Sequence, residues 1–141
     1  MKIKNIFDIA GRAMAAQMVR LNTISSNLAN AGATTGDPET VYKPLKPEFK
    51  TQYSENVKKN GISTVNVSKV VELQKEPFKI FDPNHPLADG DGYIYKAPVN
   101  VEEEMVDMMD ASRQYQNNIE VVTTLKALTL KTVSYTHLRA H

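Results

Sequence analysis

The chain has 141 residues, of which 41% are hydrophobic and 23% are charged, and its formal net charge is +1. This composition is ordinary for a soluble protein, and the small net charge predicts no general attraction to nucleic acid or membranes. The absence of cysteine excludes disulfide frameworks, cysteine-based metal sites and thiol nucleophiles.

A repeat with alternating spacings of four and three residues runs through the first 31 residues. Its nine positions, of which all but one are apolar, are Ile3, Phe7, Ala10, Met14, Gln17, Leu21, Ile24, Leu28 and Ala31. This spacing is typical of a coiled-coil seam, which must face a partner helix. The pattern predicts a helix from about Ile3 to Asn30, ended by a left-handed cap at Gly32.

The same segment lacks the features of a targeting or membrane-spanning helix. Asp8 and Arg12 interrupt the apolar stretch that a cleavable signal peptide requires, so we expect no such signal. No part of the chain reaches the roughly 18 consecutive apolar residues of a membrane span. A membrane-surface role for this basic helix is an alternative, but Asp8 and the narrow seam favour a helix partner.

The middle of the chain, residues 32–98, has the composition of a β-rich region. It begins with a flexible exit loop that lacks periodicity, and short β-branched and aromatic runs follow. Asn60-Gly61 predicts a tight hairpin turn, and Phe78 with Ile80 and Tyr93 to Tyr95 predict two short strands. Pro44 and Pro47 favour an edge or non-sheet segment.

A second long helix is predicted for residues 99–133. Asn100 and Glu103 form a capping-box pattern at its start. A stripe with the same spacing of four and three residues follows, at Val101, Met105, Met108, Ser112, Tyr115, Ile119 and Val122. The last eight residues, 134–141, form an atypical tail to which we assign no function.

The two predicted helices carry opposite net charges. Residues 1–31 hold four basic residues and one acidic residue, whereas residues 99–141 hold four basic and six acidic residues. This asymmetry predicts that the two ends of the chain complement each other.

One polar cluster in the middle region invites a chemical interpretation. His85 lies among Asp82, Asn84, Asp89 and Asp91, which is a conceivable metal or acid–base cluster. The surrounding Pro and Gly residues instead favour a turn in which these side chains bond to their own backbone. The cluster therefore predicts neither an enzyme nor a metal site.

Side-chain amides gather on both predicted helices. Asn27 and Asn30 lie near the end of the first helix, and residues 114–118 supply four further amides midway along the last. They are interpreted as polar helix surface or, in a densely packed assembly, as hydrogen-bonding groups between subunits.

Two sets of motifs resemble the bacterial flagellar basal-body rod proteins, and most of all the proximal rod members. The first set comprises residues 6–17, Arg20-Leu-Asn22 and residues 25–30; the second comprises residues 84–89, Gly92-Tyr-Ile94, Val99-Asn-Val101, Glu104-Met-Val106, residues 111–120 and Leu130-Lys-Thr132. The similarity covers nearly all of residues 4–133. Asn117 departs from the family pattern without consequence. The tail after Val133 is longer than the family's usual end, so we interpret residues 134–141 as non-native sequence.

This resemblance implies a non-enzymatic structural subunit of the flagellar drive shaft that transmits torque. It implies export by the flagellar type III apparatus without a cleaved signal, polymerisation in the periplasm, and contacts with further copies and with the rod proteins FlgB, FlgF and FliE. No cofactor, nucleic acid or inserted membrane segment is expected.

We therefore expect an α+β fold in which the long N- and C-terminal helices pack as a coiled-coil-like pair, with a small β-rich middle. The residues predicted to form the assembly interface are Phe7, Met14, Leu21, Ile24, Leu28, Met105, Met108, Tyr115, Ile119 and Val122. The alternative from another class is a soluble coiled-coil adaptor with a β insert, and a metal-dependent enzyme at residues 82–91 is a weaker third.

Overall fold

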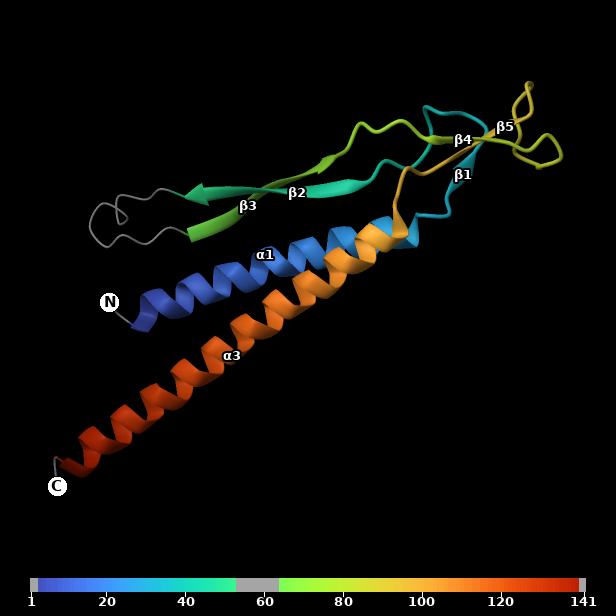
Figure 1. The fold of residues 1–141 in the computed structure, drawn as a ribbon. Helices are drawn as coiled ribbons and strands as arrows, with labels where there is room; N and C mark the ends of the chain where they lie inside the picture. Colours follow the sequence, from blue (N-terminus) through green and yellow to red (C-terminus); the bar gives the residue numbers. More distant parts are fainter. Residues whose placement is uncertain (1–2, 53–63, 140–141) are drawn as a thin grey trace.

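The computed structural model describes residues 3–52 and 64–139 as two long helices and two small antiparallel sheets (Figure 1). The elements are α1 (Ile3–Ala29), β1 (Thr34–Thr35), β2 (Leu45–Gln52), β3 (Thr64–Glu72), β4 (Phe78–Phe81), β5 (Tyr93–Lys96) and α3 (Val101–Arg139). Helix α1 packs against α3 on one side and against β2 and β3 on the other. The expected α+β class and the packing of the terminal helices are confirmed.

Helix α1 ends without the predicted left-handed cap. The only residue with a positive φ among those described is Gly92, so the prediction for Gly32 is wrong. Instead the Asn30 side chain donates a hydrogen bond to the Ser26 carbonyl, and the Ala31 N–H donates to the Leu28 carbonyl in a tighter final turn. These bonds satisfy helix-terminal carbonyls and make a left-handed residue unnecessary.

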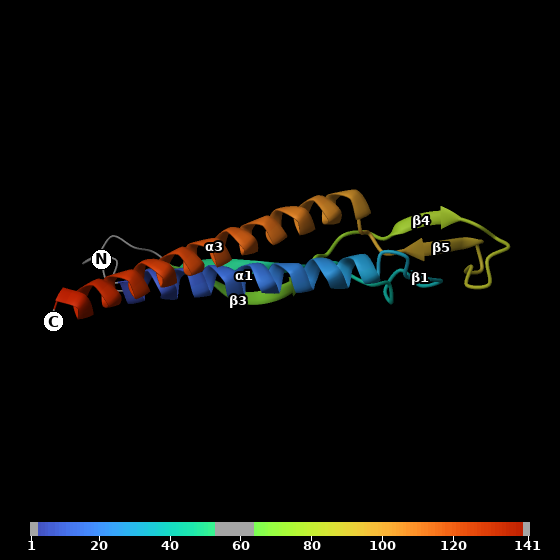
Figure 2. The ribbon, with the colours of Figure 1, turned by 90° about the horizontal axis from the view of Figure 1, so that it is seen from below.

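The residues after α1 form more than the flexible loop that composition predicts. Thr34 and Thr35 form β1, which pairs antiparallel with Lys96 and Tyr95 of β5. The short strand is stabilised by pairing with a strand that is distant in the sequence. The local composition of residues 31–38 cannot predict such a pairing. The resulting sheet has the order β1-β5-β4 and lies beyond the ends of the helices where α1 stops and α3 starts (Figure 2).

The second sheet contains β2 and β3, paired from Leu45↔Glu72 to Gln52↔Thr64 with an irregularity between Glu48 and Phe49. Pro47 lies within β2, which is compatible with its missing N–H because a two-stranded sheet has only edge strands. The predicted turn at Asn60-Gly61 lies outside the described residues. The predicted strands around Phe78 and Tyr93 are confirmed as β4 and β5.

The connection between β4 and β5 is a turn held by its own side chains. The Asp89 carboxylate accepts hydrogen bonds from the N–H groups of Asp91 and Tyr93, at 3.0 and 2.9 Å. These bonds, that of Tyr93 foremost, lower the pKa of the Asp89 carboxyl. Gly92 has φ +85°, and a Cβ there would lie 3.0 Å from the Pro83 Cβ. The turn interpretation of Asp89 is confirmed.

Helix α3 begins directly after Asn100, whose side chain accepts a hydrogen bond from the Glu103 N–H at 3.2 Å. Three glutamates occupy its first turn, where carboxylates complement the helix dipole. The helix continues to Arg139, beyond the end predicted at residue 133. None of the described helices combines the length and apolarity needed to cross a membrane.

The core is small and consists mainly of small side chains. Ala31, Ala97 and Val99 form a buried cluster where the helices meet the β region, with Ala33 and Tyr42 packed against it. Among the described residues no large side chain is fully buried. Intrachain burial therefore contributes little per residue, and much apolar surface stays exposed.

Candidate functional site

The candidate site is the pair of terminal helices, which run antiparallel. Arg20 of α1 contacts Asp110 of α3, whereas Asn27, further along α1, contacts Glu104, which precedes Asp110 on α3. Contacts that advance on one helix while they recede on the other define an antiparallel pair. Because α3 has 39 residues and α1 has 27, the end of α3 extends past the start of α1 (Figure 1).

The side of α3 that faces α1 repeats with spacings of four and three residues, as a seam should. It shares Met108, Tyr115 and Val122 with the predicted stripe, whereas Met105 and Ile119 of that stripe are exposed. The residues that are buried or half-buried at this spacing are Glu104, Met108, Ala111, Tyr115, Asn118, Val122, Leu125 and Thr129. Ala111 is fully buried, so the two helices come close at that point.

Of the ten predicted interface residues, two are exposed in the free chain and the others are at least half-buried. Ile24 is buried, whereas Met105 and Ile119 are 54% and 40% exposed. The half-buried residues are Phe7, Met14, Leu21, Leu28, Met108, Tyr115 and Val122. Most of the predicted interface residues are therefore covered by other parts of the same chain, whereas Met105 and Ile119 face solvent.

The opposite charges of the two helices meet at Arg20. Its guanidinium lies 2.9 Å from the Asp110 carboxylate and 3.6 Å from that of Asp107. The Arg20 side chain is 24% exposed and both carboxylates are more exposed, so these pairs are worth no more than about 1 kcal/mol each. They fix the register of the helices more than they stabilise them, and the predicted charge complementarity is confirmed.

A second polar contact joins both helices to β2. Asn27, on the last turns of α1, is 2% exposed and bonds to Tyr42, Leu45 and Glu104. The interpretation of this amide as solvated surface is wrong, because the start of β2 covers it. Asn30 and Asn118 instead donate to carbonyls within their own helices.

Glu104 is the titratable group at this contact. Burial raises the pKa of its carboxyl above the ordinary value of 4.5, the hydrogen bond from Asn27 acts in the opposite direction, and the charge of Asp107 adds to the rise. The folded chain therefore holds this proton to a higher pH than the unfolded chain does. Stability from Glu104 is complete below the ordinary pKa and is lost as pH rises through the folded pKa.

We expect Glu104→Gln to remove this loss. Glutamine retains an oxygen that accepts from Asn27 but carries no charge, so the variant should gain stability over the parent as pH rises from about 4 to about 8. Urea unfolding of both chains at several pH values measures the difference. Glu102→Gln, at an exposed position of the same helical turn, is the matched control. A parent-to-variant difference that does not change with pH would contradict the assignment.

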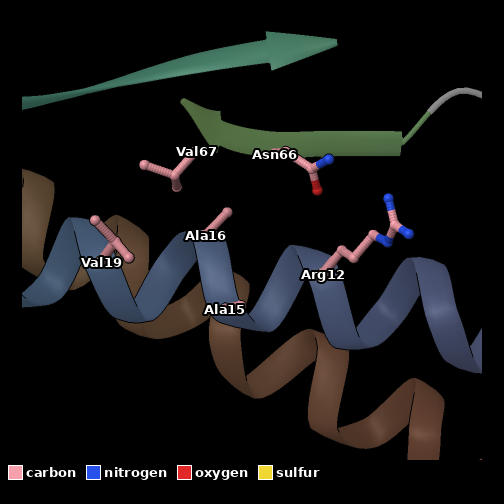
Figure 3. A pocket seen from close by; sticks show the side chains of 6 residues that line it. All are labelled: Arg12, Ala15, Ala16, Val19, Asn66 and Val67. Atoms are coloured by element: carbon pink, nitrogen blue, oxygen red, sulfur yellow. The ribbon is translucent and has the colours of Figure 1, made fainter. Parts of the chain in front are cut away.

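A shallow pocket lies between α1 and β3 (Figure 3). It is lined by Arg12, Ala15, Ala16, Val19, Asn66 and Val67, and the small Ala16 side chain points from α1 toward β3. Arg12 also lies 3.6 Å from the Asp8 carboxylate. These six lining residues include no nucleophile and no general base, so the pocket supplies no catalytic group.

Comparison with known proteins identifies what the paired helices belong to. Residues 7–36 match the family model described as "Flagella basal body rod protein", and residues 91–134 match the one described as "Flagellar basal body rod FlgEFG protein C-terminal". These two matches cover most of α1 and of α3. Proteins named flagellar basal-body rod protein FlgC from Salmonella typhimurium, Escherichia coli and Yersinia enterocolitica are 43%, 42% and 40% identical over 134 residues, which is 95% of this chain and 98% of each relative.

The chain belongs to the FlgC family of flagellar basal-body rod proteins. The resemblance that the motifs indicated is thereby confirmed, and the family is structural and non-enzymatic. This FlgC-family chain is a subunit of the basal-body rod, and it assembles there with other rod proteins. The alternative of an unrelated soluble adaptor is not favoured.

Two residues of the site could not be predicted from the sequence. No pattern points to Tyr42, and the family motif that contains Glu104 does not indicate its burial. The opposite net charges of the two ends predict that they attract each other. Net charge does not indicate that Arg20 and Asp110 are the residues that meet. For Tyr42 no local pattern exists, because its partner Asn27 lies 15 residues earlier in another element.

Proposed function

We propose that the terminal helices carry the assembly of this FlgC-family rod subunit and that its ten predicted interface residues lie at or beside contacts between subunits. One observation carries the proposal: large apolar side chains remain exposed along α3. They include Met105, Val106, Met109, Ile119 and Val121, followed by Leu128, Leu130 and Val133 further along the helix. Among the described elements, α3 contacts only α1.

Exposed apolar surface of this extent is costly for an isolated chain and favours burial against neighbours. Interfaces of the obligate kind resemble a protein core that has been divided between subunits. The small internal core and the exposed helices together fit a chain whose stability is completed in the assembly. A helix pair repeated along a rod transmits torque through many contacts of this kind.

We infer that the neighbours are further copies of the chain and the rod proteins FlgB, FlgF and FliE. The flagellar type III apparatus exports the chain without a cleaved signal, and polymerisation takes place in the periplasm. The charged residues that interrupt the N-terminal apolar stretch support this route over a cleaved signal peptide. Family membership supports the rod environment in which these neighbours occur.

Deletion of the gene tests the proposed function. We expect cells without it to lack flagellar rods and to be non-motile, and we expect the plasmid-borne gene to restore both. Electron microscopy of isolated basal bodies and swimming in soft agar are the readouts. Intact rods in the deletion strain would favour the soluble adaptor instead.

A further inference from the structure

The side chain of Asn27 makes the same pair of contacts that a neighbouring β-strand makes. Its Oδ1 accepts a hydrogen bond from the Leu45 N–H at 2.8 Å, and its Nδ2 donates to the Leu45 carbonyl at 2.9 Å. Leu45 is the first residue of β2, and its two backbone groups bond to the helix side chain. A side-chain amide on α1 therefore pairs with one full residue position on the free edge of the sheet.

The Asn27 side chain also forms hydrogen bonds with two other parts of the chain. Tyr42 donates its hydroxyl hydrogen to Oδ1 at 2.8 Å, and Nδ2 also donates to the Glu104 carboxylate of α3 at 3.3 Å. Since tyrosine has only one hydroxyl hydrogen, Ser26 must be the donor in its 3.0 Å contact with Tyr42. One buried amide on α1 thus contacts the approach to β2, the start of β2 and α3.

This position requires an amide. Aspartate has the acceptor oxygens but lacks the donors for Leu45 and Glu104, and alanine leaves the backbone groups of Leu45 without these partners. The packing between the sheet and α1 is interrupted by the pocket that Ala16, Val19 and Val67 help to line. Apolar packing at that pocket therefore does little to fix the angle between the sheet and the helices.

We propose that Asn27 is a positioning residue that fixes the orientation of the β2–β3 sheet relative to the α1–α3 pair. It holds the three layers as one rigid body at the place where α1 ends, α3 begins and the chain enters β2. Its consequence for torque rests on the proposed function: a rod subunit that rotates with its helices must carry its β region with it. The positioning itself does not depend on that function.

Distance measurements between spin labels test the proposal on the purified full chain, because the absence of cysteine restricts labelling to introduced sites. One label pair, Asn22→Cys with Ser68→Cys, spans α1 and β3. A second pair, Asn22→Cys with Asn117→Cys, spans α1 and α3. All three label positions are exposed residues of described elements. We expect narrow distance distributions for both pairs in the parent.

In Asn27→Ala we expect the α1–β3 distribution to broaden at least twofold while the α1–α3 distribution stays narrow. Tyr42→Phe, which removes one of the bonds to Asn27, should broaden the first distribution less. Asn30→Ala is the matched control, since the Asn30 side chain bonds to Ser26 within its own helix. An unchanged α1–β3 distribution in Asn27→Ala, or a broad one already in the parent, would overturn the proposal.

Swimming in soft agar separates this proposal from the proposed function. Asn27→Ala should reduce swimming to below half of the parental rate while basal bodies still contain the chain. If the distances change but swimming does not, the positioning holds and its link to torque is wrong. If the variant fails to fold, Tyr42→Phe supplies the same comparison with a smaller perturbation.

Discussion

Ile119→Asp is expected to abolish rod assembly and motility while leaving the fold of the chain intact. Ile119 is 40% exposed on α3, so a carboxylate there remains solvated in the free chain. In the proposed assembly the same carboxylate would be buried without a partner, which costs about 3–5 kcal/mol at each copy. Because the contact repeats in every copy, the penalty accumulates along the rod.

The comparison with Leu21→Asp sharpens this prediction. Leu21 is half-buried on α1, so the charge there should disturb the chain's own packing as well as assembly. Asn117→Asp adds the same charge to an exposed polar position of α3 and serves as the control. Circular dichroism reports the fold, and soft-agar swimming with isolation of basal bodies reports assembly. Normal swimming of the Ile119→Asp strain would refute the assignment of this surface.

The second large effect is expected from Ala111→Leu. Ala111 is the only residue of α3 described as buried, with 0% of its surface exposed, and α1 is the element that covers it. The larger leucine side chain cannot fit there without moving the helices apart. We expect a loss of about 1–3 kcal/mol in the free energy of unfolding, measured by urea titration.

Ala127→Leu makes the same substitution at an exposed position of the same helix. It should change stability by less than about 0.5 kcal/mol. Equal stabilities of the two variants would mean that the close contact at Ala111 does not contribute to the helix pair.

The elements that could be predicted from the sequence are those with long, regular patterns. The terminal helices, the cap at Asn100 and the strands around Phe78 and Tyr93 all have local signals that tertiary contacts reinforce. Strand β1 has no such signal, since its two threonines are ordered by pairing with β5. The predicted left-handed residue at Gly32 is likewise absent, because the Asn30 side chain bonds to a carbonyl at the end of α1 instead.

The sequence predicts the spacing of the apolar repeat on α3 better than it predicts which residues of α3 face α1. A repeat of four and three residues is satisfied by more than one set of positions, and apolarity favoured the set containing Met105 and Ile119. The structure instead places Glu104, Ala111 and Asn118 on the inner side. The polar side chains of α1 supply partners for acidic groups there, and the small alanine allows close approach. Such a choice depends on which residues face each other, which one helix alone cannot show.

Asn27 illustrates why the polar part of the site was only half predicted. An amide near a helix end is usually solvated, and its sequence neighbours give no sign of burial. Its environment is created by Tyr42 and Leu45, which follow the exit loop and β1 along the chain. Only the path of the chain after α1 makes this residue central.

A reconstruction of the basal body from the native source tests the central claim most directly. The claim predicts that α1 and α3 of this chain line contacts with neighbouring rod subunits, with Met105 and Ile119 buried between copies or against other rod proteins. If both side chains face solvent and the contacts are formed by the β region instead, the terminal helices are not the assembly interface.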